Sequence, residues 1–310
     1  MSSYNIVTLS GYGPEVIKQA SQVLETISEL GESKFAVKSY VFGGIAINRH
    51  WAPLPTLTLE ACKVAEAIFP CSVRGLKWGV GKLQMTLGLY ANIRPELFLS
   101  DSFLKLFSLK DLVAMGTEIV VVLKLIGVIY FGKCTEATSF KPEGGKSSTA
   151  RDKCSYSVPK IQQIARVAEF LPISTTPPIK IHLVDKANVL ANSQLPRKAD
   201  HHLFNSAAML IFSNPKKPNV IRLITSHADM ILYSKFDTEN LFGDVLNNET
   251  SVVPGSLGLI PSALLASIPN CKSRCLGLYK LIYGSAPDIS GNKIANRGSC
   301  KQYNKNIKIN

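Results

Sequence analysis

The strongest constraint on the fold is a repeated alternation of apolar, β-branched runs with segments of helical period. Residues 5–10 and 35–42 have the composition of strands, and residues 15–30 between them carry apolar side chains at helical spacing. Parallel strands need a crossover connection, which is usually a helix. The alternation therefore predicts an α/β fold with a parallel-rich sheet covered by helices.

The same pattern continues along the chain. It predicts further helices at residues 58–67, 158–170 and 186–195, and further strands at 68–73, 119–122, 128–131 and 179–184. Between Cys134 and Tyr156 lies a polar run with a Gly-Gly pair and a proline, which composition alone predicts to be a flexible loop.

Residues 239–264 begin as a polar segment and continue as a Gly/Pro/Ser-rich one, which predicts a polar helix, a loop and then a small apolar helix. Asp244 and Asn248 are four residues apart, so on a helix they share one face. Oxygen ligands at that spacing can hold a hard divalent cation. A lone aspartate is more often a solvated helix residue, and from the residues alone both readings stay open.

Composition excludes several classes of protein. The 310 residues are 46% hydrophobic and 18% charged, as in a globular domain, and no apolar run approaches the roughly 20 residues of a membrane helix. The first residues enter a strand without a basic leader, so a cytoplasmic protein without membrane partners is expected. The seven cysteines form no CxxC pair and are expected to be reduced thiols.

The formal net charge of +13 raises the question of an anionic partner. Lysine and arginine are spread over the whole chain, without a nucleic-acid-binding motif or interleaved aromatic residues. No specific nucleic-acid partner is therefore expected.

Short motifs in a fixed order carry a family resemblance. They are GGIAI at 43–47, PLP at 53–55, KWG at 77–79, LYANIRP at 89–95, IYFGK at 129–133, VDKANVLANS at 184–193, SAAM at 206–209, LFGDVLNNETSVVPGSLGLIPSALLAS at 241–267 and GSAPDI at 284–289. In this set the chain resembles 3-isopropylmalate dehydrogenases of the isocitrate/isopropylmalate dehydrogenase family over nearly its full length. The resemblance implies NAD-dependent oxidative decarboxylation of 3-isopropylmalate in leucine biosynthesis.

The resemblance also implies the isopropylmalate-dehydrogenase-like α/β fold, with two domains and a large, mixed, mostly parallel sheet flanked by helices. Residues 1–95 and 254–310 would form a discontinuous cofactor-binding domain, shortened at its C-terminus relative to the family. Residues 96–253 would form the dimerisation and substrate domain, with a protruding arm near 134–156. The missing C-terminal helices of the first domain would leave an apolar face exposed.

Catalytic and substrate-binding roles follow from the matched motifs. Tyr130 stands at the position of the family's catalytic acid and Lys186 at that of its base, while Arg94, Asn188 and Val189 match residues that line the substrate site. Without the resemblance, a tyrosine in an apolar strand is usually a packing residue and a helix lysine a solvated one.

The NAD site is the best-matched part. The family's adenosine-binding loop corresponds to Gly284, Ser285, Ala286, Pro287, Asp288 and Ile289, with a later contact at Asn296. A carboxylate at Asp288 accepts hydrogen bonds from ribose hydroxyls and repels a 2′-phosphate, so the resemblance favours NAD over NADP.

Other positions depart from the family. Two of its three substrate arginines are replaced by Gln84 and Leu123, and two of its three metal aspartates by Asn205 and Asn248, which leaves Asp244. Mg²⁺ or Mn²⁺ binding is therefore expected to be weak and activity impaired or lost. Lysine also replaces a family acid at three positions, Lys124, Lys160 and Lys280, which accounts for part of the basic charge.

The family pairs two subunits, and each of its active sites draws residues from both. A homodimer is one expectation for this chain. The alternative is an inactive member that acts through a heterodimer with an intact subunit. The motif around Lys186 survives while the arginine side has changed, and this asymmetry motivates the alternative.

Overall fold

The structure is a computed structural model of the chain. It describes residues 2–11, 14–31, 33–71, 79–97, 118–126, 131–132, 134–135, 150–153, 155, 157–170, 180–185, 220–224, 234–238, 240–251, 253–268, 275–282 and 292. Within these ranges no helix is long and apolar enough to cross a membrane.

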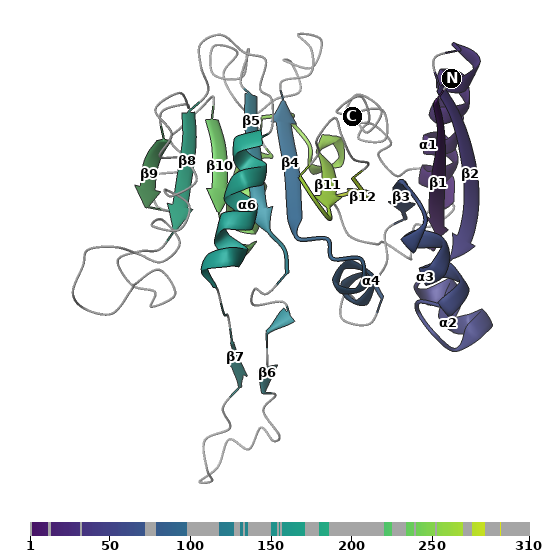
Figure 1. The fold of residues 1–310 in the computed structure, drawn as a ribbon, viewed down its shortest axis with the longest axis horizontal. Helices are drawn as coiled ribbons and strands as arrows, with labels where there is room; N and C mark the ends of the chain where they lie inside the picture. Colours follow the sequence, from purple (N-terminus) through teal and green to yellow (C-terminus); the bar gives the residue numbers. More distant parts are fainter. Residues whose placement is uncertain are drawn as a thin grey trace.

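A ten-stranded sheet runs through the molecule in the order β2-β1-β3-β12-β11-β4-β5-β10-β8-β9 (Figure 1). The strands are β1 Ser2–Ser10, β2 Ser33–Val41, β3 Ala67–Pro70, β4 Ala91–Leu97, β5 Glu118–Lys124, β8 Lys180–Asp185, β9 Val220–Ile224, β10 Ser234–Thr238, β11 Pro261–Leu265 and β12 Gly277–Leu281. Neighbours are parallel except along β12-β11-β4-β5, which is antiparallel. The predicted α/β class with a mixed, mostly parallel sheet is confirmed.

The helices lie on both faces of this sheet. They are α1 Pro14–Glu29, α2 Gly44–His50, α3 Thr56–Lys63, α4 Val80–Thr86, α6 Val158–Phe170 and α8 Asn240–Thr250, with a 3₁₀ turn at Leu257–Leu259. The predicted apolar stripe of α1 packs toward β1 and β2 and buries Val16, Ala20 and Leu24. The helix predicted at residues 158–170 is α6, with the same bounds.

Two helices sandwich the middle of the sheet. Ile93 of β4 and Val120 of β5 pack in one cluster with Ile161 of α6. Arg94 is the next residue on β4, so its side chain points to the opposite face, where α8 also contacts β5. On this face α8 lies over β5 and β10, and the Arg94 side chain reaches it from β4 through Asp244.

The predicted arm begins and ends in paired strands. β6 Cys134–Thr135 and β7 Arg151–Asp152 are antiparallel partners, and they lie away from the large sheet in Figure 1. Residues 136–149 fall outside the described part, so the shape of the arm beyond this pair stays a prediction.

Several sequence predictions need correction. The small apolar helix expected at the end of residues 239–264 is wrong, because Pro261–Leu265 is strand β11. This segment fits between β12 and β4, and that pairing buries Leu264 completely. The helix at 58–67 ends at Lys63, and the strand at 68–73 ends at Pro70.

Two further segments are tested only in part or not at all. Phe131 lies in a helical turn rather than a strand, and the rest of 128–131 falls outside the described part, as does the helix predicted at 186–195. The boundary predicted after residue 95 falls within β4, and β4 pairs with β5 over seven residue pairs. The division into two domains stays a prediction.

Candidate functional site

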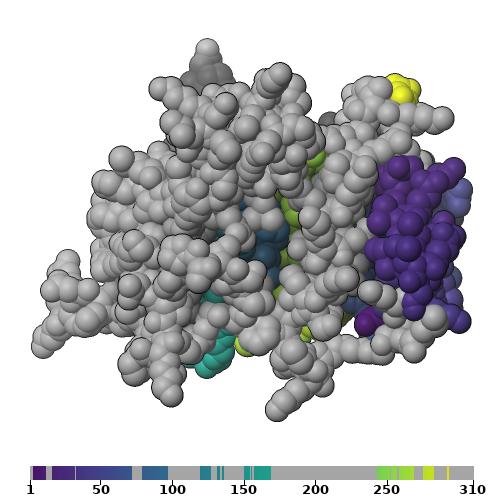
Figure 2. All heavy atoms as spheres, turned by 90° about the horizontal axis from the view of Figure 1, so that it is seen from above, coloured from purple at the N-terminus to yellow at the C-terminus, as the bar shows by residue number. Residues whose placement is uncertain are grey.

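The candidate site begins with an ion pair between β4 and α8. Arg94 Nη1 lies 2.8 Å from Asp244 Oδ1, and the two side chains are 10% and 28% exposed. Figure 2 shows blue atoms of the β4 region beside green atoms of the 240–265 region near the middle of one face. Arg94 and Asp244 are both predicted site residues, and the fold brings them into direct contact although they are 150 positions apart in the sequence.

A buried amide extends this pair inward. We orient the Asn247 side chain so that its nitrogen donates to Glu96 Oε1 at 2.7 Å and its oxygen accepts from Arg94 Nη1 at 3.3 Å, because the opposite orientation faces donor to donor. Asn247 and Glu96 are both 0% exposed. Asp244, Arg94, Asn247 and Glu96 form one continuous polar chain.

Sequence reasoning missed Glu96 and Asn247. The available signal was their spacing: Glu96 is two residues after Arg94 on a strand, and Asn247 three residues after Asp244 on a helix. Each therefore lies on the same face as its predicted neighbour. A polar residue that recurs at the period of its strand or helix indicates a buried polar layer.

Burial controls the charge of Glu96. Loss of hydration raises the pKa of its carboxyl from 4.5 to about 8, while the Thr250 side chain and the Arg94 guanidinium lower it by less. The Thr250 hydroxyl, which also contacts the Leu246 carbonyl at 2.8 Å, makes the larger of these two lowering contributions. At neutral pH Glu96 is therefore mostly a neutral acid.

A second cation approaches from β12. Lys280 lies opposite Ser262 of β11, and continuing the β11–β4 register by one residue from Ala263–Ile93 places Ser262 opposite Arg94. Lys280 is half-buried, and burial lowers the pKa of its ammonium to about 8. Arg94 lowers this pKa further and Asp244 raises it, which places all three groups in one electrostatic environment.

The positions at which the resemblance implies two further substrate arginines are buried. Leu123 lies opposite Asn92 in the β4–β5 ladder and is 0% exposed, and Gln84 on α4 is 2% exposed. The register places Leu123 on the face of the sheet that carries Arg94. Within the described residues Arg94 is the single remaining arginine of the expected clamp.

Lys124, another lysine at a family acid position, lies on the opposite face. Its Nζ donates to Gln163 Oε1 of α6 at 3.0 Å and lies 4.6 Å from the centre of the Tyr90 ring. It is 2% exposed. These contacts give Lys124 a packing role and place it outside the candidate site.

The residues at the expected metal position do not fit a hard divalent cation. Asn248 lies one turn after Asp244 on α8 and is exposed, while Asp244 Oδ1 is engaged by Arg94. The described donors are thus one carboxylate and one amide, and no group of three His, Cys, Asp or Glu residues occurs in this part of the chain. Mg²⁺ and Ca²⁺ sites use several anionic oxygens.

We expect millimolar Mg²⁺ to leave the melting temperature unchanged, because a cation stabilises a fold only in proportion to its affinity. The double change Asn205→Asp with Asn248→Asp should restore a shift in a thermal unfolding assay. A clear Mg²⁺ shift in the unaltered chain would contradict this assessment of the amides.

The remaining predicted site residues lie outside the described part of the chain: Tyr130, Lys186, Asn188, Val189, Asn205, Gly284, Ser285, Ala286, Pro287, Asp288, Ile289 and Asn296. Their roles stay predictions. The described half of the site is the arginine and aspartate side.

Comparison with known proteins defines the class. Residues 5–300 match the isocitrate/isopropylmalate dehydrogenase family, so the chain belongs to that family. A 3-isopropylmalate dehydrogenase of Kluyveromyces lactis is 42% identical over 94% of this chain and 82% of its own length. The 3-isopropylmalate dehydrogenase of Saccharomyces cerevisiae is 41% identical over 93% of this chain and 80% of its own.

Solved structures agree on the fold. The isocitrate dehydrogenase from Methylococcus capsulatus superposes with a TM-score of 0.74 at 23% identity, covering 96% of this chain and 82% of its own. A β-decarboxylating dehydrogenase from Thermococcus kodakarensis gives a TM-score of 0.67 at 24% identity, covering 96% and 80%. At these identities the likeness concerns the fold alone.

Proposed function

We propose that the chain is a 3-isopropylmalate dehydrogenase-like protein of leucine biosynthesis, an NAD-dependent oxidoreductase whose own activity is impaired or lost. Family membership and relatives at about 40% identity support the reaction class. The observation that carries the impairment is the direct pairing of Arg94 with Asp244, beside a buried leucine where the resemblance gives a second arginine.

The reaction makes separate demands on this chain's residues. Bound NAD would accept a hydride from the carbon that bears the substrate hydroxyl, and residues 284–289 with Asn296 are proposed to hold its adenosine half. Lys186 is proposed to take the hydroxyl proton, and Tyr130 to return a proton to carbon after loss of carbon dioxide. Arg94 would donate charge-assisted hydrogen bonds to a substrate carboxylate.

The described residues meet the last demand only partly. A neutral amide at Gln84 and a hydrocarbon at Leu123 replace two charged donors, and each lost charge-assisted hydrogen bond weakens binding by about 1.5–3 kcal/mol. Two losses correspond to roughly 10²–10⁴ in affinity. Arg94 must in addition share its Nη1 with Asp244 and Asn247.

NADH production from 3-isopropylmalate tests the proposal. We expect the unaltered chain to fall at least about a hundredfold below an intact relative in kcat/KM, because an unclamped substrate is not held in a reactive pose. Adding Asn205→Asp and Asn248→Asp should leave turnover low. Turnover comparable to the relative would overturn the proposed impairment and support a fully active enzyme.

A second candidate function is a subunit that works only with an intact partner. The motif DKANVL at 185–190 and the β6–β7 pair at the base of the arm favour it. In one site of such a heterodimer the partner would supply the arginines, the tyrosine and two aspartates. This chain would supply Lys186 and Asn205, so that site could retain partial activity.

Co-expression with an intact subunit, followed by purification through a tag on this chain, tests the second candidate. Lys186→Ala in this chain should abolish the heterodimer's residual activity, whereas Lys160→Ala, at an exposed position on α6, should not. Failure to recover a heterodimer, or equal activity of the two variants, would refute it.

The proposed function also implies a localisation, an oligomeric state and a division into domains. We place the chain in the cytoplasm, as a dimer, with residues 1–95 and 254–310 as the cofactor-binding domain and 96–253 as the dimerisation and substrate domain. Limited proteolysis that releases fragments cut near these boundaries would support the division.

A further inference from the structure

Three adjacent strands present a row of polar residues on one face of the sheet. Arg94 on β4, Ser262 on β11 and Lys280 on β12 are register neighbours, with the buried serine between the two cations. Strands lie roughly 4.8 Å apart, so the two cationic residues are rooted about 10 Å from each other. Both side chains lie on the face of the sheet that carries Ser262.

The described charges of this row do not balance. Arg94 and Lys280 carry two positive charges against the single carboxylate of Asp244, because Glu96 is held as a neutral acid by burial. The site as described therefore attracts an anion.

Arg94 has an N–H donor that no described acceptor engages. Its side chain is 90% buried, and its Nε has no acceptor among the residues that the structure describes. A guanidinium carries five N–H donors, and the contacts of Arg94 with Asp244 and Asn247 both use Nη1. A buried donor without an acceptor is costly, so it marks a place where a ligand oxygen would be stabilising.

We infer that Lys280 and Arg94 together bind a small dicarboxylate at this site. The Lys280 ammonium supplies the positive charge that a divalent metal ion would otherwise supply. Each cation takes one carboxylate, and Ser262 lies between them. A metal ion at Asp244 would instead stand beside a guanidinium and an ammonium, which repel it. The inference takes only its class of ligand from the proposed function.

Calorimetric titration with 3-isopropylmalate, without NAD, tests this inference separately from turnover. We expect the same Kd in EDTA and in Mg²⁺. Lys280→Gln should weaken binding about tenfold or more, since a charge-assisted hydrogen bond is lost, while Lys280→Arg should retain most of it.

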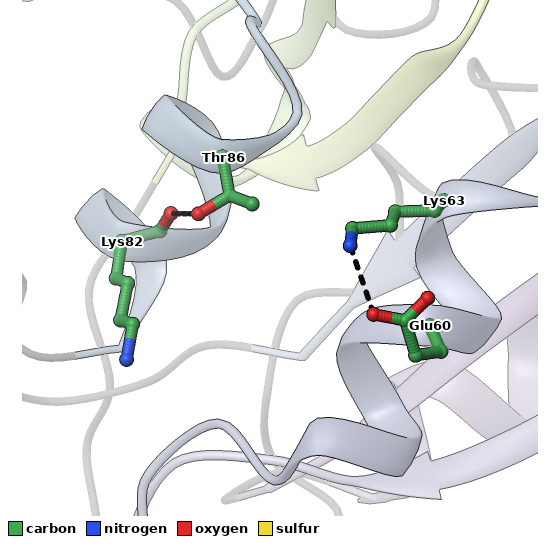
Figure 3. A network of polar contacts seen from close by, with 4 residues as sticks. All are labelled: Glu60, Lys63, Lys82 and Thr86. Atoms are coloured by element: carbon green, nitrogen blue, oxygen red, sulfur yellow. Dashed lines mark hydrogen bonds and ion pairs between the residues drawn. The ribbon is translucent and has the colours of Figure 1, made fainter.

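Lys82→Gln is the matched control and should leave the Kd unchanged. Lys82 is an exposed lysine on α4 whose carbonyl accepts from the Thr86 hydroxyl at 2.8 Å, while its ammonium extends away from the helix (Figure 3). Thermal unfolding of each variant reports whether the fold is kept. Binding that requires Mg²⁺, no binding to the folded unaltered chain, or equal Kd values for Lys280→Gln and the unaltered chain would each overturn the inference.

Discussion

Replacing Glu96 by glutamine should remove a loss of stability that the unaltered protein shows between about pH 4.5 and pH 8. The folded-state pKa of Glu96 is raised from 4.5 to about 8 by burial. Below pH 4.5 both folded and unfolded states hold the proton, and above pH 8 neither does. Between them only the folded state keeps it, so the free energy of unfolding falls as the pH rises.

The size of the effect follows from the same numbers. The gap from 4.5 to about 8, at about 1.36 kcal/mol per pH unit, amounts to about 4–5 kcal/mol. Glutamine has nearly the same shape and cannot ionise, so it keeps the contact with Asn247 without this cost. The free energy of unfolding of Glu96→Gln, relative to that of the unaltered chain, should therefore rise between pH 4.5 and about pH 8.

Urea unfolding of both proteins at pH 5 and pH 8 measures this difference, and other titrating groups cancel in the comparison. Glu60→Gln serves as control, because Glu60 pairs with Lys63 at an exposed site and surface pairs contribute little (Figure 3). Identical pH dependence for Glu96→Gln and the unaltered chain would show that Glu96 is ionised in the fold at pH 5.

Restoring an arginine at position 123 should destabilise the protein by about 3–5 kcal/mol rather than repair it. Leu123 is 0% exposed, and its register neighbour on β4 is Asn92, whose oxygen already accepts from Ser262 at 2.7 Å. A guanidinium placed there would be a buried charge on the same face as Arg94, which already engages Asp244, and a buried charge without its own partner is the costly case.

Chemical denaturation of Leu123→Arg against two matched variants checks this prediction. Leu57→Arg makes the same change at a side chain that is 72% exposed, and its effect should stay within about 0.5 kcal/mol. Leu123→Met keeps the apolar volume and should cost less than about 1.5 kcal/mol. A stable Leu123→Arg protein would mean that a carboxylate is within reach and that the arginine clamp can be rebuilt one residue at a time.

How far the sequence predicts the fold depends on whether local pattern and tertiary pairing agree. The helix at 158–170 and the stripe Val16, Ala20 and Leu24 are local patterns that packing reinforces, and both predictions are confirmed. Pro261–Leu265 is too short for its periodicity to decide between helix and strand. Its strand conformation comes from β4 and β12 on either side, which no local pattern shows.

The same division holds for the candidate site. Arg94 and Asp244 follow from motifs, and the structure brings them together. The hydrogen bonds of Asn247 to Glu96 and Arg94 depend on how α8 docks on β5 and β10, which sequence spacing alone does not determine. The roles of Tyr130 and Lys186 still rest on the resemblance.

The order of strands in the sheet also determines when the protein can fold during synthesis. β11 and β12, from residues 261–281, lie between β3 and β4, which end at residues 70 and 97 and are therefore made at least 164 residues earlier. Until the ribosome has released them, the facing edges of β3 and β4 have no strand to join them. Unpaired edges are prone to pair with other chains. The middle of the sheet closes last, so slow translation late in the message would prolong the period most exposed to aggregation.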